Sequence, residues 1–271
     1  MLRQEMSGST VCVIPARFGS TRFPGKPLAV VRGRTMIQRM VEIAGAAEGV
    51  DRVLVATDDD RIRAHVDGFG GEAVMTGDDC RNGTERVARA VDALGLDAAR
   101  VVNLQGDAVL TPPWVLEAVV HALVDEPGAD IVTPAARLDA SSRELLVEAK
   151  ANGEVGGTSV VMDRRGYALY FSKALVPFLR DASGGAATFR HIGLYGYTRE
   201  SLARFVALEP TPLELTEGLE QLRALENGMR VRVVEVDYRG RRHLAIDSPE
   251  DLARVERLLD EDGELVEEPL A

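Results

Sequence analysis

A short stretch near the start of the chain carries three cations among residues that can approach a phosphate group closely. Arg17, Arg22 and Lys26 lie within ten positions, beside Ser20, in Ile14-Pro15-Ala16-Arg17-Phe18-Gly19-Ser20-Thr21-Arg22-Phe23-Pro24-Gly25-Lys26-Pro27-Leu28. Glycines allow close backbone approach, and amides, hydroxyls and fixed positive charges hold phosphate oxygens. The whole chain has a net charge of −11, so surface solubility explains this group of cations poorly. The stretch predicts a phosphate site, although it matches neither a P-loop nor a dinucleotide fingerprint.

Two aspartates are candidates for a metal site. Asp107 follows Gln105-Gly106, and Asp247 precedes Ser248. Hard cations such as Mg²⁺ prefer one or two carboxylates together with phosphate oxygens and water. Taken one at a time, the same residues are equally typical of a turn or of the start of a helix. The residue types alone leave both explanations open.

The segments that must position these residues alternate between strand and helix patterns. Short apolar runs rich in β-branched residues occupy 10–15, 52–56, 72–75, 100–104 and 130–133, and stripes with helical spacing lie at 36–44, 87–94 and 114–123. This order predicts an α/β fold with a mostly parallel sheet covered on both faces. Such sheets bind ligands beyond the carboxyl ends of their strands, which is where the cationic stretch and Asp107 fall.

After residue 137 the pattern changes. We expect strands at 159–163, 168–172, 191–198 and 230–236, a helix at 217–227 closed by Gly228, and a last helix opened by Ser248 and Pro249. We expect one domain over residues 9–261, in which residues 137–190 form a smaller appended lobe or dimer region. The acidic tail, residues 262–271, is expected to be solvated.

Composition excludes several classes of function. The negative charge argues against a nucleic-acid partner, which would need a basic surface. No apolar run approaches the roughly 20 residues that span a bilayer, and residues 1–6 lack the apolar centre of a secretion signal, so we expect a cytoplasmic protein without a membrane partner. Cys12 lies in an apolar run and should pack in the core, and no Cys or His spacing indicates zinc.

The cationic stretch resembles the signature of the sugar nucleotidyltransferases, and specifically of the 3-deoxy-manno-octulosonate (Kdo) cytidylyltransferases. The resemblance runs along nearly the whole chain. Further matching blocks are Val55-Ala56-Thr57-Asp58, Met75-Thr76, Gly83-Thr84-Glu85-Arg86, Val102-Asn103-Leu104-Gln105-Gly106-Asp107, Ala168-Leu169-Tyr170-Phe171-Ser172, Arg190-His191-Ile192-Gly193-Leu194-Tyr195-Gly196-Tyr197, Leu219-Glu220-Gln221-Leu222-Arg223 and Asp247-Ser248-Pro249-Glu250-Asp251-Leu252. The resemblance implies a Rossmann-like nucleotidyltransferase sheet with a small appended lobe, and a homodimer.

The resemblance also implies a reaction and a set of site residues. An acidic acceptor attacks the α-phosphorus of CTP, CMP is transferred and pyrophosphate leaves, with Mg²⁺ as the cofactor. The residues implied to act in catalysis are Arg17, Lys26, Asp107 and Asp247, of which Asp107 and Asp247 hold the metal. The nucleotide would be bound by Ala16, Arg17, Ser20, Arg22, Lys26, Asn82, Gly83 and Gln105, with Ala16 and Asn82-Gly83 reading cytosine. The acceptor would be bound by Lys173, Arg190, His191, Tyr195, Glu220 and Gln221.

The acceptor side departs from the family pattern. Ala108 and Val109 replace Glu-Pro after the Gln-Gly-Asp block, Lys173 replaces Arg, and Ser159 replaces Lys. Arg81 is an added cation, and the stretch between Lys173 and Arg190 is shortened. Arg and Lys are not equivalent at a carboxylate site, so these changes bear on the acceptor.

These departures leave two candidate acceptors. A smaller acceptor needs fewer polyol contacts, so we favour a small phosphonate such as phosphonoformate, with Kdo as the alternative. Two further alternatives are a uridylyl- or other nucleotidyltransferase, and an inert nucleotide-binding sensor.

Overall fold

The computed structural model describes residues 8–19, 22–96, 98–154, 156–180 and 187–266. Its strands are β1 (Ser9–Ala16), β2 (Val30–Val31), β3 (Arg34–Thr35), β4 (Arg52–Thr57), β5 (Ala73–Met75), β6 (Ala98–Leu104), β7 (Ile131–Arg137), β8 (Ser159–Met162), β9 (Ala168–Ser172), β10 (Phe189–His191), β11 (Leu194–Thr198) and β12 (Val231–Val236). Its helices are η1 (Lys26–Leu28), α1 (Met36–Gly45), α2 (Asp60–Gly68), α3 (Gly83–Ala93), α4 (Pro113–Asp125), α5 (Ala140–Ala151), α6 (Arg199–Val206), α7 (Pro212–Glu217), α8 (Gln221–Glu226) and α9 (Pro249–Asp262).

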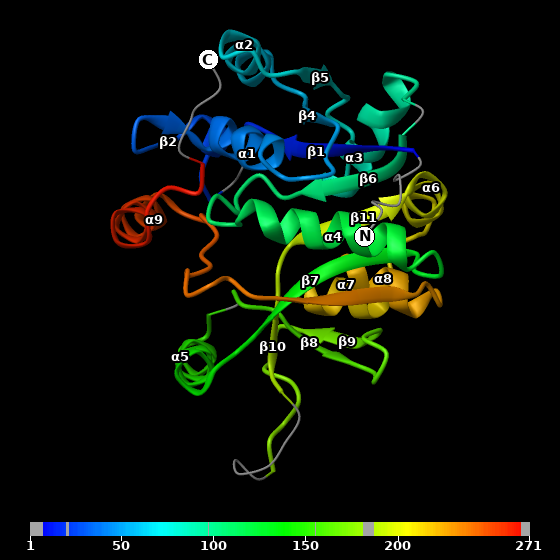
Figure 1. The fold of residues 1–271 in the computed structure, drawn as a ribbon, viewed down its shortest axis with the longest axis vertical. Helices are drawn as coiled ribbons and strands as arrows, with labels where there is room; N and C mark the ends of the chain where they lie inside the picture. Colours follow the sequence, from blue (N-terminus) through cyan, green and yellow to red (C-terminus); the bar gives the residue numbers. More distant parts are fainter. Residues whose placement is uncertain (1–7, 20–21, 97, 155, 181–186, 267–271) are drawn as a thin grey trace, which may run out of the picture.

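One large sheet runs through the centre of the molecule (Figure 1). Its strand order is β5-β4-β1-β6-β11-β7-β10-β8-β9, and β12 pairs with β7. The strands β5, β4, β1 and β6 are parallel neighbours, and β12 is parallel to β7. β11 runs antiparallel between β6 and β7, and β8, β9 and β10 form an antiparallel end. The prediction of an α/β fold with a mostly parallel sheet is confirmed.

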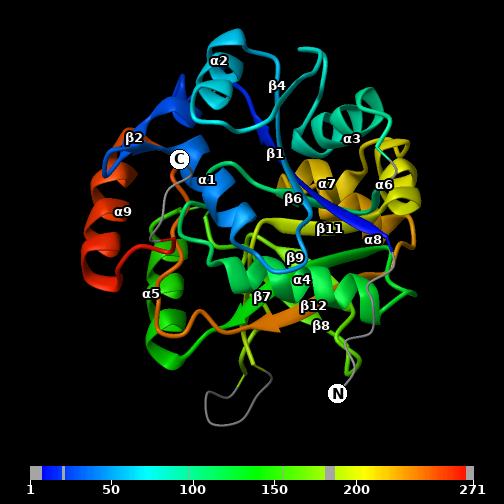
Figure 2. The ribbon, with the colours of Figure 1, turned by 45° about the horizontal axis from the view of Figure 1, so that its top comes forward.

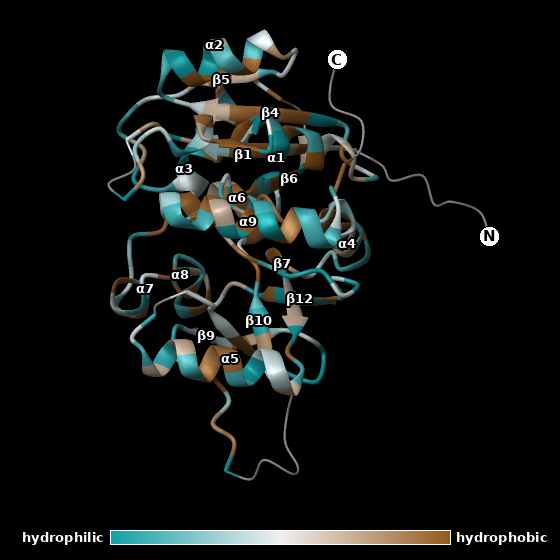
Figure 3. Cartoon of the chain, turned by 90° about the vertical axis from the view of Figure 1, so that its left-hand side faces the viewer, coloured by the Kyte–Doolittle hydropathy of each residue, from teal (hydrophilic) through white to brown (hydrophobic). Residues whose placement is uncertain are grey.

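Alternate residues of β1 face opposite sides of this sheet. Cys12 and Ile14 belong to one hydrophobic cluster and Val11 and Val13 to another, as the period of two in a strand requires. The helices α1, α4 and α9 contribute to the first cluster, and α3, α6 and α8 to the second. Figure 2 shows these helices on the two sides of the strands. Figure 3 shows β1 and β4 as mainly hydrophobic, whereas α9 carries both hydrophilic and hydrophobic residues.

The helix start that was predicted from a capping residue, that of α9, agrees with the structure. Ser248 caps α9 and forms a capping box with Asp251, and Pro249 is the first helical residue. None of the helices in the described part of the chain is long and apolar enough to cross a membrane.

Two predicted elements have other bounds in the structure. The strand expected at 191–198 is broken at Ile192 and Gly193, because β10 pairs with β7 and β8 whereas β11 lies between β6 and β7. The helix expected at 217–227 begins only at Gln221, because Gly218 adopts a left-handed conformation with φ +64° and ends the preceding helix, α7. Helix α5 was not expected, because its apolar residues do not form a clear stripe. Leu145 and Val147 are exposed there, and only Leu146 is buried.

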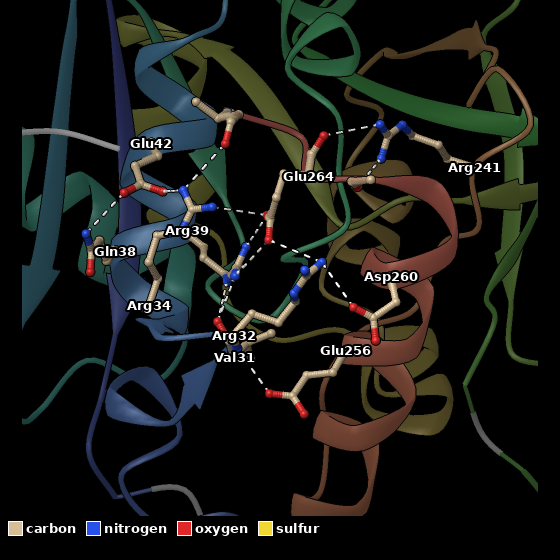
Figure 4. Close-up of polar contacts among 12 residues, drawn as sticks. Val31, Arg32, Arg34, Gln38, Arg39, Glu42, Arg241, Glu256, Asp260 and Glu264 are labelled. Carbon is tan, nitrogen blue, oxygen red and sulfur yellow. Dashed lines mark hydrogen bonds and ion pairs between the residues drawn. The ribbon is translucent and has the colours of Figure 1, made fainter. Parts of the chain in front are cut away.

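The segment 263–266 of the predicted acidic tail is fixed rather than solvated (Figure 4). Glu264 accepts a hydrogen bond from Arg39 over 2.7 Å and lies 3.2 Å from Arg34. Arg39 also donates to the carbonyl of Val31 over 2.7 Å and is only 5% exposed, so its charge needs a carboxylate nearby. Leu265 and Val266 pack against the first hydrophobic cluster. The rest of the tail, 267–271, lies outside the described residues.

Candidate active site

The loops that follow β1 and β6 meet the start of α3 and the turn between β10 and β11. A side-chain carbon added at Gly83 would lie 3.2 Å from the Pro15 ring, and one added at Gly106 would lie 3.1 Å from the Pro15 carbonyl oxygen. One added at Gly193 would lie 3.4 Å from Gln105. These close approaches place the candidate site at the carboxyl ends of parallel strands, as predicted.

Lys26 connects the loops that carry the two candidate metal ligands. Its ammonium lies 3.1 Å from the carboxylate of Asp107 and donates to the carbonyl oxygen of Ile246 over 2.8 Å. The amide of Ile246 donates to the backbone carbonyl of Asp107 over 3.1 Å, which holds the following residue, Asp247, next to this loop. Arg22 pairs with Asp247 at 3.0 Å. The structure therefore brings two predicted cations and both predicted aspartates together.

Both aspartates remain accessible to a ligand. The side chain of Asp107 is 32% exposed and that of Asp247 is 46% exposed, whereas Lys26 is more buried at 18%. Each carboxylate faces one cation, so the group is electrically balanced without a bound nucleotide. Binding of a polyphosphate and a divalent cation would bring at least four negative and two positive charges into this group. The cations of the group suit the polyphosphate and its carboxylates suit the metal ion, which explains why both signs of charge meet here.

The cationic stretch turns sharply before Lys26. Gly25 has a left-handed backbone with φ +72°, and its amide donates to the carbonyl of Phe18 over 2.9 Å. The Phe18 ring lies under the guanidinium of Arg61, 3.3 Å from the ring centroid. The side chain of Arg17 is exposed and forms no ion pair within the described residues. Ser20, which was predicted to bind the nucleotide, lies outside the described residues.

The loop predicted to read the base forms the start of α3. The side-chain oxygen of Asn82 accepts a hydrogen bond from the amide of Glu85 over 2.9 Å and so caps the helix. Gly83 is the first helical residue. Ala16, at the end of β1, is buried and pairs with Thr57 of β4. The base-reading role of Ala16 and Asn82-Gly83 stays a prediction.

Behind this loop, a network of buried polar side chains includes three predicted acceptor ligands. Asn103 donates to the hydroxyl of Thr84 over 3.0 Å, and Thr84 donates to Glu220 over 2.7 Å. Tyr195 donates to the side-chain oxygen of Gln221 over 3.1 Å. Burial raises the pKa of Glu220. One buried side-chain atom in each of Asn103, Glu220 and Gln221 has no partner within the described residues, so these residues retain hydrogen-bonding capacity for a ligand.

His191 is a buried, uncharged histidine. One ring nitrogen lies 2.8 Å from the hydroxyl of Thr133, and the ring meets Phe171 edge-on at 5.0 Å. Burial, assisted by the charge of Lys173, lowers the pKa of His191 to about 3. The side chain is only 7% exposed. In any contact with the acceptor, His191 would therefore act as an uncharged hydrogen-bonding group.

Lys173 and Arg190 are the two cations among the residues predicted to bind the acceptor. Neither side chain forms an ion pair with a carboxylate in the part of the chain that the structure describes. The backbone amide of Lys173 donates to Glu217 over 2.8 Å, which fixes the start of its loop. Burial lowers the pKa of Lys173, although the charge of Asp247 opposes this shift.

The residues that depart from the family pattern have local partners. The Arg81 side chain is 49% exposed and pairs with Glu85 of α3 at 2.6 Å. Ser159 donates to the carbonyl of Ala174 over 2.6 Å and accepts from the amide of Val176 over 3.1 Å, so it ties the loop after β9 to β8. Neither observation gives Arg81 or Ser159 a contact on the acceptor side.

Sequence reasoning missed a buried polar group beside Arg190. The hydroxyls of Thr111 and Tyr238 and both ring nitrogens of His243 are buried without a partner among the described residues. The rings of Tyr238 and His243 meet edge-on at 5.7 Å. Burial, with the charge of Arg190, lowers the pKa of His243 to about 3. No motif or spacing marked these residues, because Thr111 lies in the loop before α4, and Tyr238 and His243 lie in a segment after β12 that matches no recognised block.

Comparison with known proteins assigns the family. A family model described as Cytidylyltransferase matches residues 11–231. The matched span includes the cationic stretch, the start of α3, Asp107 and the strands of the acceptor side. The chain belongs to the cytidylyltransferase family. This cytidylyltransferase is therefore an enzyme of the nucleotidyltransferase class.

Relatives of this cytidylyltransferase cover nearly all of it. A protein of Maricaulis maris named 3-deoxy-manno-octulosonate cytidylyltransferase is 55% identical over 258 residues, which are 95% of this chain and 100% of the relative. Proteins with the same name from Myxococcus xanthus and Desulfatibacillum aliphaticivorans are 45% and 44% identical, over 92% of this chain and 96% and 98% of their own length.

Solved structures show the same fold. A CMP:2-keto-3-deoxy-manno-octonic acid synthetase complexed with CTP is 35% identical, with a TM-score of 0.83, and the match covers 94% of this cytidylyltransferase and 99% of that chain. A cytidylyltransferase from Leptospira borgpetersenii is 14% identical with a TM-score of 0.58, which shows likeness of fold alone.

Proposed function

We propose that this enzyme transfers CMP from CTP to 3-deoxy-manno-octulosonate (Kdo), forming CMP-Kdo and releasing pyrophosphate. The observation that carries the proposal is the contact of Lys26 with both Asp107 and the Ile246 carbonyl, which assembles cations and carboxylates at the ends of β1 and β6. A CTP complex of a structural relative and the names of full-length relatives support CTP and Kdo as the two substrates.

The residues at this site fit Mg²⁺. Asp107 and Asp247 are two partly exposed carboxylates on adjoining loops, and hard divalent cations take such ligands with phosphate oxygens and water. Among the described residues, no three His, Cys, Asp or Glu side chains gather into a group that would hold a metal alone. Bound there, Mg²⁺ would neutralise charge on the phosphate groups.

The side chains of the site would act by positioning and by charge. Lys26, Arg22 and the exposed Arg17 would leave their present surroundings to hold the phosphates of CTP, where positive charge favours departure of pyrophosphate. The start of α3 would bind the base. Lys173 and Arg190 would hold the carboxylate of the acceptor so that its 2-hydroxyl lies in line with the α-phosphorus.

The preference for a phosphonate acceptor gains no support from the comparisons, which favour the Kdo alternative. Two of the positions that depart from the family pattern have structural contacts, since Ser159 ties the loop after β9 to β8 and Arg81 pairs with Glu85. Membership of an enzyme family also argues against the alternative of an inert nucleotide-binding sensor. A homodimer and a cytoplasmic location stay predictions.

The product tests this proposal. The purified enzyme should convert CTP and Kdo, with Mg²⁺, into a sugar-linked CMP diester and pyrophosphate in equal amounts, as measured by ³¹P NMR and mass spectrometry. CTP hydrolysis to free CMP, or no reaction with Kdo at any concentration, would overturn it.

A further inference from the structure

Three cations that lack an ion-pair partner gather at the β8–β10 end of the sheet. Lys173 follows β9, Arg190 lies in β10, and Lys150 is near the end of α5. No carboxylate of the described residues lies within ion-pair distance of any of the three. Several other buried cations have carboxylate partners: Arg39 pairs with Glu264 at 2.7 Å and Arg86 pairs with Asp58 at 2.6 Å. An unpaired group of cations in a protein with a net charge of −11 therefore requires an explanation.

The strand register brings two of these cations close together. Ser159 of β8 is opposite Arg190 of β10 on one side and opposite Ser172 of β9 on the other. Neighbouring strands are about 4.8 Å apart, so the backbones of Arg190 and Ser172 are separated by roughly 10 Å. Lys173 directly follows Ser172. Both side chains are long enough for their charges to reach a common anion.

Lys150 approaches the same place from a helix. Its ammonium donates a hydrogen bond to the carbonyl of Gly156, in the segment that leads into β8. Two residues further on, the carbonyl of Thr158 accepts a hydrogen bond from the amide of His191 over 2.8 Å. The ammonium is thus held beside the strand that carries Arg190 and His191. Helix α5 has no counterpart among the sequence blocks on which the family resemblance rests.

The charges of Lys173 and Arg190 repel the charge of Lys150 in the free protein. Burial lowers the pKa of Lys150, and these two charges lower it further. The charge of Asp247 acts on Lys173 in the opposite direction. A negatively charged ligand among the three would replace repulsion by attraction. Lysine and arginine offer only hydrogen-bond donors and a positive charge, which match a carboxylate, a group that only accepts and is negatively charged.

We propose that Lys150 binds the carboxylate of the acceptor together with Lys173 and Arg190, and that Lys150 is a specificity-determining residue for acidic acceptors. The inference deepens the proposed function and rests on it. It adds a residue of α5 to an acceptor site that the sequence drew from β10, β11, the loop after β9 and the start of α8. It also accounts for the loss of a cation at Ser159, because the charge is supplied from α5 instead.

Steady-state kinetics of pyrophosphate release test this role. Lys150→Met keeps the apolar stem and removes the charge, and should raise KM for Kdo by roughly tenfold, the usual value of one charge-assisted contact. KM for CTP and kcat should change less than about threefold. Lys150→Arg should restore most of the affinity. Arg257→Met, which removes an exposed charge from α9, is the matched control and should leave every parameter unchanged.

A second arm separates charge recognition from a structural effect. With the carboxamide of Kdo, which lacks the charge, Lys150→Met should have little effect. The preference for acid over amide in kcat/KM should therefore fall roughly tenfold in this variant. An equal loss with acid and amide, or a Lys150→Met variant that behaves as Arg257→Met does, would overturn the proposal.

Failure of the proposed function would be visible separately, as no turnover of Kdo by the wild-type enzyme. The same variants would then be compared with phosphonoformate, another acid. A selective rise in its KM would support Lys150 as an anion ligand, and unchanged kinetics would refute it.

Discussion

The ammonium of Lys26 lies 3.1 Å from the carboxylate of Asp107 and 2.8 Å from the carbonyl oxygen of Ile246, the residue before Asp247. One side chain from the first loop thus links two loops that are far apart in the sequence. Its positive charge also lowers the repulsion between two carboxylates that have to lie close together before a metal binds. These contacts of Lys26 hold the two loops next to each other when no nucleotide is bound.

We predict that Asp107→Asn and Asp247→Asn each lower kcat by about 100-fold or more, because each removes a charge that stabilises the transferring phosphate. The measurement is pyrophosphate release at saturating Mg²⁺, with folding checked by thermal unfolding. Asp67→Asn, at an exposed position of α2, is the control and should be silent. Rates near that of the wild type in either site variant would refute the metal assignment.

We predict a strong preference for CTP over UTP, ATP and GTP. A site that hydrogen-bonds one exocyclic group rejects analogues that lack it, because its own polar groups are left unpaired. Ratios of kcat/KM measured with each nucleotide and a fixed acceptor decide the point. Comparable efficiency with UTP would favour the broader nucleotidyltransferase alternative.

Lys173→Met should raise KM for the acceptor roughly tenfold, because it removes one charge-assisted contact, and should change KM for CTP little. Initial rates with either substrate varied provide both constants. Arg81→Met is a useful comparison, since the Arg81 side chain pairs with Glu85 at 2.6 Å. A larger rise in KM for the acceptor with Arg81→Met than with Lys173→Met would show that the acceptor binds near Arg81 and not near Lys173.

Glu264→Gln should destabilise the protein by about 3 kcal/mol, because it leaves the buried guanidinium of Arg39 without its carboxylate. Glu261→Gln, which breaks an exposed pair with Arg242, should cost less than about 1 kcal/mol. Urea unfolding at neutral pH measures both. Equal stability of the two variants would show that the Glu264 contact contributes nothing.

The same pair predicts a dependence on pH. Burial alone would raise the pKa of Glu264, but the hydrogen bonds and charge of Arg39, with Arg34 and Arg32, hold it below the ordinary value of 4.5. Since the folded pKa is depressed, the stabilisation is present above about pH 4.5 and is lost as the pH falls through the folded value. The difference in unfolding free energy between wild type and Glu264→Gln should therefore shrink in acid. A difference that is constant from pH 7 to pH 3 would contradict this.

The sequence was sufficient to predict those elements and site residues that local residue patterns or family blocks mark. The apolar runs predicted the parallel strands, and the Ser248 cap predicted the start of α9. The cationic stretch and the two aspartates were predicted from residue types and family blocks, and the structure brings Lys26, Asp107 and Asp247 together.

The sequence was insufficient where tertiary contacts decide. Glu264 appeared as part of an acidic, solvated tail, because nothing local shows that Arg39 of α1 needs a partner. Lys150 was not considered, since its significance depends on the contact of its ammonium with Gly156 and on the strand pair that places Ser159 opposite Arg190. His243 and Tyr238 are recognisable only as polar groups buried without partners, which no pattern of residues reveals.

The most direct test of the central claim is a comparison of kcat/KM for Kdo and for phosphonoformate, with saturating CTP and Mg²⁺, by pyrophosphate release. We predict efficient turnover of Kdo and a value for phosphonoformate lower by about 100-fold or more, because a site built to hydrogen-bond a polyol leaves its polar groups unpaired with a smaller acid. Efficient turnover of phosphonoformate with none of Kdo would contradict the account.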